Sequence, residues 1–304
     1  MTVSIIVPIL NEEQNIPLLY NEIEKYCPVN FELIFIDDGS TDNSFLEIFA
    51  LSQVHASVKC LSLSRNFGHQ NSIMAGLEHA TGESIIIMDG DLQHPPALIP
   101  KMLTKLEEGF DIVNTKRLDT KNISSLKKWS SKAFYSFINS ISDTKMEIGV
   151  TDFKAFNKKV LGSILQFKEK DLFLRGIFSW IGFKSCSMAF EAPERMHGTT
   201  KYSLSKMWSL ALRGTTSFSF KPLRIAVIVG SIISLAAFAF AIFALFAYFK
   251  GETVQGWAST IIALMLLGGT QLLAIGFLGE YIASLFTETK KRPLYLINKK
   301  INME

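Results

Sequence analysis

The 304-residue sequence contains little cysteine and no strong excess of charge of either sign. Its three cysteines, Cys27, Cys60 and Cys186, lie far apart and form no Cys-x-x-Cys pair. This spacing offers no zinc site and no disulfide framework, and it fits a reducing compartment. The 31 basic and 28 acidic residues leave a net charge of +3, which is too small to indicate nucleic-acid binding.

Two common nucleotide-binding loops are also absent. No Gly-x-Gly-x-x-Gly follows the first apolar run, which argues against a dinucleotide-binding Rossmann domain, and there is no Walker-type Gly-Lys-Ser/Thr loop. The first apolar run, Val3 to Leu10, lacks a preceding basic segment and is interrupted by Pro8. We therefore interpret it as a strand and not as a signal peptide. A nucleotide would have to be bound by another arrangement.

Residues 2–160 alternate short apolar runs, typical of buried strands, with amphipathic stretches typical of helices. This alternation predicts an α/β domain with a mostly parallel sheet covered by helices on both faces. The expected strands are Val3–Ile9, Phe31–Asp37, Val58–Leu63, Ser84–Asp89 and Asp111–Lys116, and the expected helices span about 16–26, 43–53, 70–80 and 96–108.

Two carboxylates, Asp89 and Asp91, follow the fourth expected strand in the stretch Asp89-Gly90-Asp91-Leu92-Gln93. Open α/β sheets bind their ligands at the carboxyl ends of parallel strands, which is where these side chains would lie. Carboxylate oxygens suit a hard cation that also binds phosphate, with Mg²⁺ or Mn²⁺ the leading candidates. Taken alone, the stretch is equally consistent with a polar loop between a strand and a helix.

The first three expected strands also end in polar residues. A single such ending is more often a turn, as in Asp-Gly-Ser. Four in succession at one edge of a sheet favour a binding site. These endings are Asn11-Glu12 after the first strand, Asp37 to Asp42 after the second, and Ser64 to His69 after the third.

Together these motifs resemble those of the family 2 glycosyltransferases. The sequence has Pro-x-x-Asn-Glu at 8–12, Asp-Asp-Gly-Ser at 37–40, Arg-Asn-x-Gly at 65–68 and Asp-x-Asp-Leu-Gln-x-Pro-Pro at 89–96. It is most similar to the polyprenyl-phosphate glycosyltransferases, which include dolichyl-phosphate mannose synthases and bactoprenol glucosyltransferases. The resemblance implies a GT-A fold, a metal and diphosphate site at Asp89, Asp91 and Gln93, and a nucleotide-sugar pocket lined by Pro8, Asn11, Glu12, Asp37, Asp38, Ser40, Arg65, Asp89 and Gln93.

The same resemblance assigns roles to residues between 110 and 202, which alone would be ordinary surface groups. It implies an acceptor-phosphate site, and basic groups beside a hydroxyl suit a phosphate monoester. Lys154 stands where relatives usually have arginine. The implied acceptor-phosphate residues are Arg117, Lys127, Lys128 and Ser131, and the implied catalytic residues are Asp91, Asp152, Arg195 and Lys201.

The C-terminal third has the composition of a membrane protein. Residues 225–249 and 254–279 are runs of 25 and 26 residues without a charge. Each exceeds the roughly 20 residues needed to cross a bilayer. We expect a catalytic domain at 1–202, an amphipathic juxtamembrane segment at 203–222, two transmembrane helices within 223–286 (about 225–249 and 254–283) and a basic cytoplasmic tail at 287–304.

Basic residues cluster before the first apolar run and after the second. The positive-inside rule therefore predicts that both termini and the catalytic domain lie on the cytoplasmic side of a bacterial inner membrane. Gly268, Gly269, Gly276 and Gly279 would allow close helix packing, including packing between copies in a homo-oligomer.

These features predict an inverting, metal-dependent transfer of one sugar to undecaprenyl phosphate for cell-surface glycan modification, such as that of the lipopolysaccharide O-antigen. Residues 216–224 resemble bactoprenol glucosyltransferases, which favours UDP-glucose; UDP-N-acetylglucosamine, UDP-galactose and GDP-mannose remain alternatives. A processive membrane glycan synthase is a second hypothesis, although its Gln-x-x-Arg-Trp motif is absent. A third is a catalytically idle membrane subunit that binds a nucleotide or scaffolds a partner.

Overall fold

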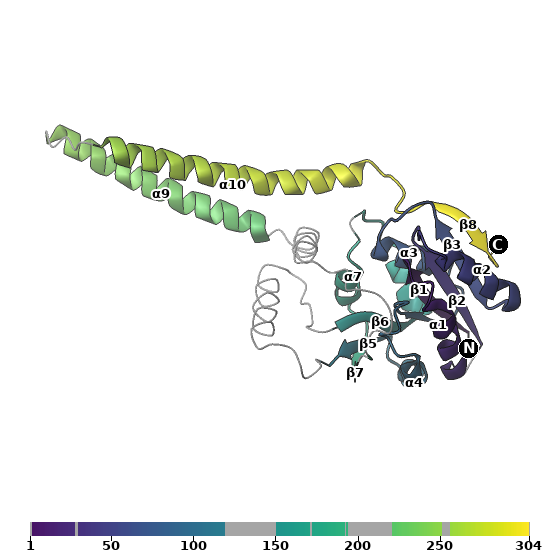
Figure 1. Ribbon diagram of the computed structural model, residues 1–304. Helices are drawn as coiled ribbons and strands as arrows, with labels where there is room; N and C mark the ends of the chain where they lie inside the picture. Colours follow the sequence, from purple (N-terminus) through teal and green to yellow (C-terminus); the bar gives the residue numbers. More distant parts are fainter. Residues whose placement is uncertain are drawn as a thin grey trace.

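A computed structural model describes residues 2–27, 30–118, 150–170, 172–191, 193, 221–250 and 256–303. An α/β domain is followed by two long helices that extend away from it, and the chain then returns to the domain (Figure 1). The elements are β1 (Val3–Ile9), α1 (Ile16–Tyr26), β2 (Phe31–Asp37), α2 (Ser44–Val54), β3 (Val58–Leu63), α3 (His69–His79), β4 (Ser84–Ile87), η1 (Pro96–Leu98), α4 (Ile99–Glu107), β5 (Ile112–Arg117), β6 (Val150–Asn157), α6 (Lys158–Ile164), α7 (Leu174–Trp180), β7 (Ser185–Phe190), α9 (Lys221–Phe249), α10 (Trp257–Thr289) and β8 (Ile297–Ile301).

The described strands form one eight-stranded sheet in the order β7-β5-β6-β4-β1-β2-β3-β8. The central strands β4, β1, β2 and β3 are parallel, as the sequence predicts. β6 runs antiparallel to both β4 and β5, so the sheet is mixed at this side. The bounds of β1, β2 and β3 are those expected, whereas β4 ends at Ile87, two residues before the predicted end.

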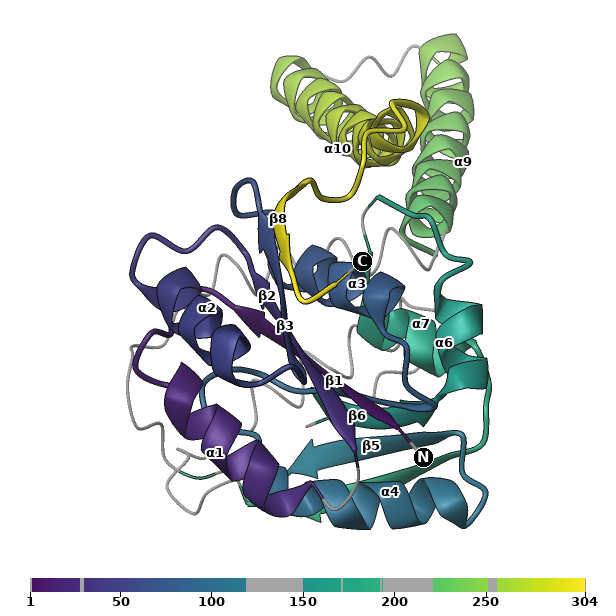
Figure 2. The ribbon, with the colours of Figure 1, turned by 90° about the vertical axis from the view of Figure 1, so that its right-hand side faces the viewer.

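The core lies on both faces of this sheet. β1 is buried along its whole length, and its alternate side chains enter two separate hydrophobic clusters. Helices α1, α2 and α4 cover one face, and α3, α6 and α7 cover the other (Figure 2). Burial on both faces explains why the central strands appear in the sequence as continuous apolar runs rather than as alternating patterns.

The expected tail at 287–304 contains a strand of the catalytic sheet. β8 pairs antiparallel with β3, and the Asn302 Nδ2 group donates hydrogen bonds to the carbonyl oxygens of Ser52 and Val58. Without β8, β3 would be an edge strand with unpaired backbone groups. The short sequence Ile-Asn-Lys-Lys-Ile carries too little apolar pattern to predict this pairing.

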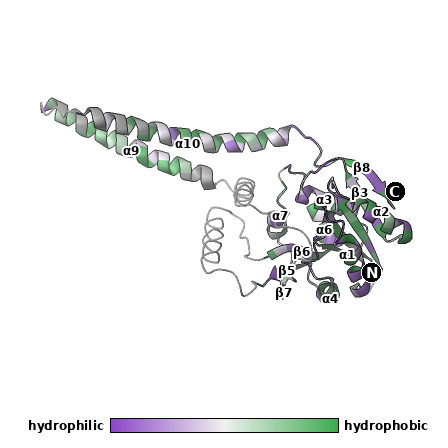
Figure 3. Cartoon of the chain, viewed as in Figure 1, coloured by the Kyte–Doolittle hydropathy of each residue, from purple (hydrophilic) through white to green (hydrophobic). Residues whose placement is uncertain are grey.

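Helices α9 and α10 lie side by side and expose apolar side chains along their length (Figures 1 and 3). Leu235 is 75% exposed and Leu272 is 71% exposed, so these faces have no protein partner within the described chain. By length and composition, Leu266–Thr289 is one helical stretch that could cross a membrane, and Ala226–Phe240 is a shorter apolar stretch. These statements concern the described residues alone.

Candidate active site at the carboxyl edge of the sheet

The strand order reverses between β1 and β4, because the chain proceeds from β1 to β2 and β3 and then returns to the other side of β1. Open α/β sheets bind ligands at such a switch point, beyond the carboxyl ends of the strands. Asp89 and Asp91 follow β4 at this place. Gly90 between them approaches the end of β1 so closely that an added Cβ would lie 2.5 Å from the Ile9 Cδ1 atom. A larger residue here would have to displace the end of the Ile9 side chain.

The loop after β4 is fixed by its own hydrogen bonds. The Asp89 backbone N–H donates to His94 Nδ1 at 2.9 Å, and the Gln93 N–H donates to Asp91 Oδ1 at 3.1 Å. His94 is buried, and its ring stacks on Phe153 of β6 with centroids 5.1 Å apart. His94 thus positions the loop through the backbone, a role that the sequence did not indicate.

The carboxylates of this loop fit a divalent cation. Asp89 Oδ1 is buried and accepts no hydrogen bond, although His69 Nε2 lies 3.5 Å from it, and Asp91 is 9% exposed. A buried carboxylate oxygen without a donor is unfavourable unless a cation neutralises it. Within the described chain, no group of three histidine, cysteine or acidic side chains has metal-binding spacing, so Asp89 and Asp91 would form an open site completed by a ligand.

Gln93 and Arg117 connect this loop to the end of β5. Arg117 Nη1 lies 3.4 Å from Gln93 Oε1, and Arg117 is exposed. The structure therefore brings one predicted acceptor-phosphate residue beside one predicted diphosphate residue. Lys127, Lys128, Ser131, Arg195 and Lys201, which were also predicted as site residues, lie outside the described residues.

A second charged group borders the loop. Arg175 Nε and Nη2 each lie 2.7 Å from one oxygen of Asp152, which forms a bidentate ion pair between α7 and β6. His69 at the start of α3 lies between the two acidic positions, with Nε2 3.5 Å from Asp89 Oδ1 and 3.7 Å from Asp152 Oδ2. Because His69 contacts both carboxylates, the charges of Asp152 and Asp89 interact with the same imidazole.

The titration of this group follows from its contacts. Burial alone would raise the pKa of Asp152, but Arg175 and His69 hold that pKa well below its usual range. Burial alone would lower the pKa of His69, but Asp152 and Asp89 outweigh it and raise that pKa. Next to this pair, burial lowers the pKa of Lys154 to about 8, and its Nζ atom lies 4.2 Å from the centroid of the Phe178 ring.

Sequence reasoning did not identify His69 or Arg175. His69 directly follows the Arg-Asn-Phe-Gly motif at the end of β3, and this position was the available signal. Arg175 lies in a stretch without a motif, and only the packing of α7 against the sheet brings it to Asp152.

The residues that the sequence predicts to line the nucleotide-sugar pocket differ in how deeply they are buried. Asp37 and Asp38 are each 3% exposed, and their oxygens are occupied by the loops around them. Asp37 accepts from the Ser40 N–H and the Ser62 hydroxyl, and Asp38 accepts from the backbone N–H groups of Phe67 and Gly68. Burial raises the pKa of Asp38. These two carboxylates therefore hold the loops in place.

The other residues predicted for the nucleotide-sugar pocket range from buried to exposed and lie at the ends of β1, β2 and β3. The Asn11 N–H donates to Ser40 Oγ at 3.0 Å, which joins the ends of β1 and β2. Glu12 accepts from Asn15 Nδ2 at 2.6 Å, and Pro8 is buried within β1. Arg65 is exposed and stacks on Phe67, with its Cζ atom 4.2 Å from the ring centroid.

Comparison with known proteins identifies the class to which this geometry belongs. The glycosyl transferase family 2 model matches residues 4–165, which span β1 to α6 and include Asp89, Asp91 and Asp152. The chain therefore belongs to glycosyltransferase family 2.

Relatives extend the match over the whole chain. The prophage bactoprenol glucosyl transferase homolog of Escherichia coli (strain K12) is 40% identical, with 98% of this chain and 99% of that protein covered. The bactoprenol glucosyl transferase of Shigella phage SfX is 38% identical, with 99% and 100% covered. A crystal structure of a mycobacterial protein has a TM-score of 0.50 at 14% identity, covers 71% of this chain and 72% of that chain, and supports the fold alone.

Proposed function

We propose that this protein transfers one glucose from UDP-glucose to undecaprenyl phosphate at the cytoplasmic face of a bacterial membrane. The observation that carries the proposal is the carboxylate pair Asp89 and Asp91 at the switch point, with the buried Asp89 Oδ1 atom lacking a donor. The lipid and the sugar are taken from the full-length relatives, which are named bactoprenol glucosyl transferases.

The residues of the site suit the two charged ends of this reaction. Asp89 and Asp91 would hold Mg²⁺ or Mn²⁺, which supplies a Lewis acid for the leaving diphosphate. Gln93 would border the diphosphate, and Arg117, whose Nη1 atom lies 3.4 Å from Gln93 Oε1, would bind the phosphate of the lipid. His69 and the Asp152–Arg175 pair keep the Asp89 carboxylate oriented toward the ligand.

The transfer itself breaks one bond and forms one. A phosphate oxygen of the lipid bonds to the anomeric carbon of glucose while the bond from that carbon to the UDP diphosphate breaks, and the α-linked donor gives a β-linked product. The attacking phosphate is already an anion near neutral pH, so the site needs no strong general base. The negative charge that develops on the diphosphate of the departing UDP would be stabilised by the cation that Asp89 and Asp91 would hold.

The chain topology supports a double crossing of the membrane by α9 and α10. β3 precedes both helices and β8 follows both, yet the two strands pair in one sheet. A single crossing would place β3 and β8 on opposite sides of the membrane. A hairpin of two crossings keeps them on the same side, and it places the active site beside the surface where a lipid phosphate lies.

The test is incubation of membranes that contain the protein with labelled UDP-glucose and undecaprenyl phosphate. We expect a lipid that carries a single glucose, formed only when Mg²⁺ or Mn²⁺ is present. A labelled polymer would indicate a processive synthase instead. The absence of labelled product with UDP-glucose and with the three alternative donor sugar nucleotides named next would indicate a catalytically idle subunit. UDP-N-acetylglucosamine, UDP-galactose and GDP-mannose in parallel reactions identify the donor.

A further inference from the structure

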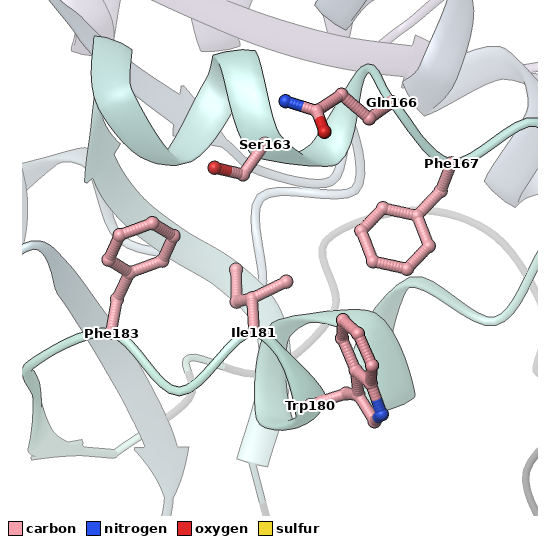
Figure 4. Close-up of a pocket in the computed structure, with 6 residues that line it drawn as sticks. All are labelled: Ser163, Gln166, Phe167, Trp180, Ile181 and Phe183. Atoms are coloured by element: carbon pink, nitrogen blue, oxygen red, sulfur yellow. The ribbon is translucent and has the colours of Figure 1, made fainter.

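An aromatic hollow lies on the surface between α6 and α7, and none of its residues belongs to the active-site set. Figure 4 shows the Phe167 and Trp180 rings next to each other on one side of it and the Phe183 ring on the other side. The Phe167 and Trp180 rings meet edge to face, with centroids 5.6 Å apart and planes at 86°. Trp180 is nevertheless 64% exposed. Such exposure of a large aromatic side chain is unusual on a protein surface that faces water. The hollow is lined by Ser163, Gln166, Phe167, Trp180, Ile181 and Phe183.

Helices α6 and α7, which carry or directly precede the residues of the hollow, lie on the side of the domain that faces α9 and α10 (Figures 1 and 2). The segment between α6 and α7 contacts the end of α10, where the Lys170 N–H donates to Glu288 Oε1 at 2.5 Å. Glu288 is the penultimate residue of α10 and belongs to the apolar stretch Leu266–Thr289. The chain segment that begins at Phe167 of the hollow therefore contacts the end of the candidate membrane span.

Cations lie next to residues of the hollow and directly after the end of α10. The Lys159 Nζ atom lies 4.9 Å from the centroid of the Phe183 ring, and Lys168 is exposed on the segment that leads to Lys170. Lys290, Lys291 and Arg292 are exposed directly after α10. Tryptophan rings with adjacent lysines and arginines are typical of the head-group region of a bilayer, where an apolar ring and a polar edge are both satisfied and anionic lipids attract the cations.

We propose that the hollow around Trp180 and Phe167 docks into the head-group region of the membrane that α10 crosses. The proposal rests on the membrane location given under the proposed function. This contact is a second attachment of the catalytic domain, separate from the covalent link to the helices. It limits the tilt of the domain and so fixes the distance of Asp89 and Asp91 from the lipid surface.

Tryptophan fluorescence tests the docking in the full-length protein. Trp129, Trp208 and Trp257 are replaced by phenylalanine, and the chain is reconstituted in phosphatidylethanolamine and phosphatidylglycerol vesicles. We expect lipids brominated near the head-group end of their acyl chains to quench Trp180, and aqueous iodide to quench it little. The matched control carries Trp180→Phe as well and Leu46→Trp on α2, on the opposite side of the domain, where the native side chain is 59% exposed. That control should be quenched by iodide and not by brominated lipid.

Two results would overturn the docking. Trp180 could behave like the Leu46→Trp control, which would place it in water, or it could be protected from both quenchers, which would mean that protein covers it. Sedimentation of the chain with carbonate-washed vesicles tests the membrane location separately, and glucose transfer in the same vesicles tests the proposed reaction. A chain that sediments and transfers glucose but keeps Trp180 in water contradicts the docking alone.

Discussion

At the scale of single residues, the carboxylates of the site differ in what occupies their oxygens. Asp38 uses both oxygens to hold backbone N–H groups of the β3–α3 loop, and Asp37 is similarly occupied. Asp89 instead has a buried oxygen without a donor. The sequence presents all of these as acidic residues after strands. Their hydrogen bonds separate the groups that shape the pocket from the group left for a ligand.

We predict that Asp91→Asn nearly abolishes glucose transfer. The substitution removes one of two negative charges that would hold the cation, and such electrostatic stabilisation is worth several kcal/mol, or more than about a hundredfold in rate. Transfer of labelled glucose measures the effect, and thermal unfolding and membrane sedimentation should be unchanged. Glu107→Gln on α4 removes a charge from the exposed surface and should retain full activity. Full glucose transfer by the Asp91→Asn enzyme would contradict the assignment of Asp91 as a metal ligand.

Arg175→Met should destabilise the domain because it leaves Asp152 without its bidentate partner. Breaking a fully buried ion pair costs about 3–5 kcal/mol, and we expect about 2 kcal/mol here because the Arg175 side chain is 34% exposed. Denaturant unfolding in detergent measures the change. Arg65→Met removes an exposed arginine that stacks on Phe67 and should change stability by less than about 0.5 kcal/mol.

The effect of Arg175→Met should depend on pH in a defined direction. The pKa of Asp152 in the folded protein lies below its unfolded value of about 3.9, so the ion pair contributes fully above that pH. Its contribution is lost as the pH falls through the lowered pKa of the folded state. Unfolding curves should therefore show a constant difference from wild type down to about pH 5 and a shrinking one below about pH 4. A difference that grows in acid would contradict this account.

At the scale of elements, the apolar runs were sufficient to predict the bounds of β1, β2 and β3, because these strands are buried on both faces. β6 was not predicted, since its sequence Val-Thr-Asp-Phe-Lys-Ala-Phe-Asn places Asp152 and Lys154 among apolar residues. Those charges are compatible with a strand because Arg175 pairs with Asp152 and the Phe178 ring lies beside Lys154. Residues of α7, which is distant in sequence, therefore make the charged residues of β6 compatible with a strand.

Strand β8 gives a prediction at this scale. Asn302→Ala removes the side-chain amide that donates to the Ser52 and Val58 carbonyl oxygens, and we expect a loss of about 1–2 kcal/mol in unfolding free energy. Asn298→Ala on β8 is the control, because Asn298 is exposed, whereas Asn302 directly follows the strand. Equal thermal shifts in the two variants would mean that the C-terminal strand does not anchor to the sheet through Asn302.

At the scale of the whole molecule, the pairing of β3 with β8 constrains how the chain can meet a membrane. The two strands flank α9 and α10 in sequence, so the number of crossings between them must be even. Charge bias in the sequence also predicts that both ends of the helix pair lie on one side of the membrane, and it identifies that side as the cytoplasmic one. The pairing of β3 with β8 and the charge bias therefore agree that both ends of the helix pair lie on one side of the membrane.

Single cysteines can test this topology in a chain whose Cys27, Cys60 and Cys186 are replaced by serine. In intact spheroplasts, a membrane-impermeant maleimide should label Gly251→Cys, which lies between the two helices in sequence. The same reagent should label Asn298→Cys on β8 only after the membrane is opened. Labelling of both positions in intact spheroplasts would contradict the cytoplasmic placement of the sheet.

The sequence alone determined the family, the central parallel strands, the positions of Asp89 and Asp91, and the two apolar runs, because these depend on local periodicity and on short motifs. The tertiary structure decided what depends on contacts between distant residues. It joined His69, Asp152 and Arg175 to the loop of Asp89 and Asp91, showed that Asp38 holds the β3–α3 loop, and returned the expected tail to the sheet as β8. Local sequence cannot encode which surfaces meet, because each such contact gains its free energy only when both partners are already in place.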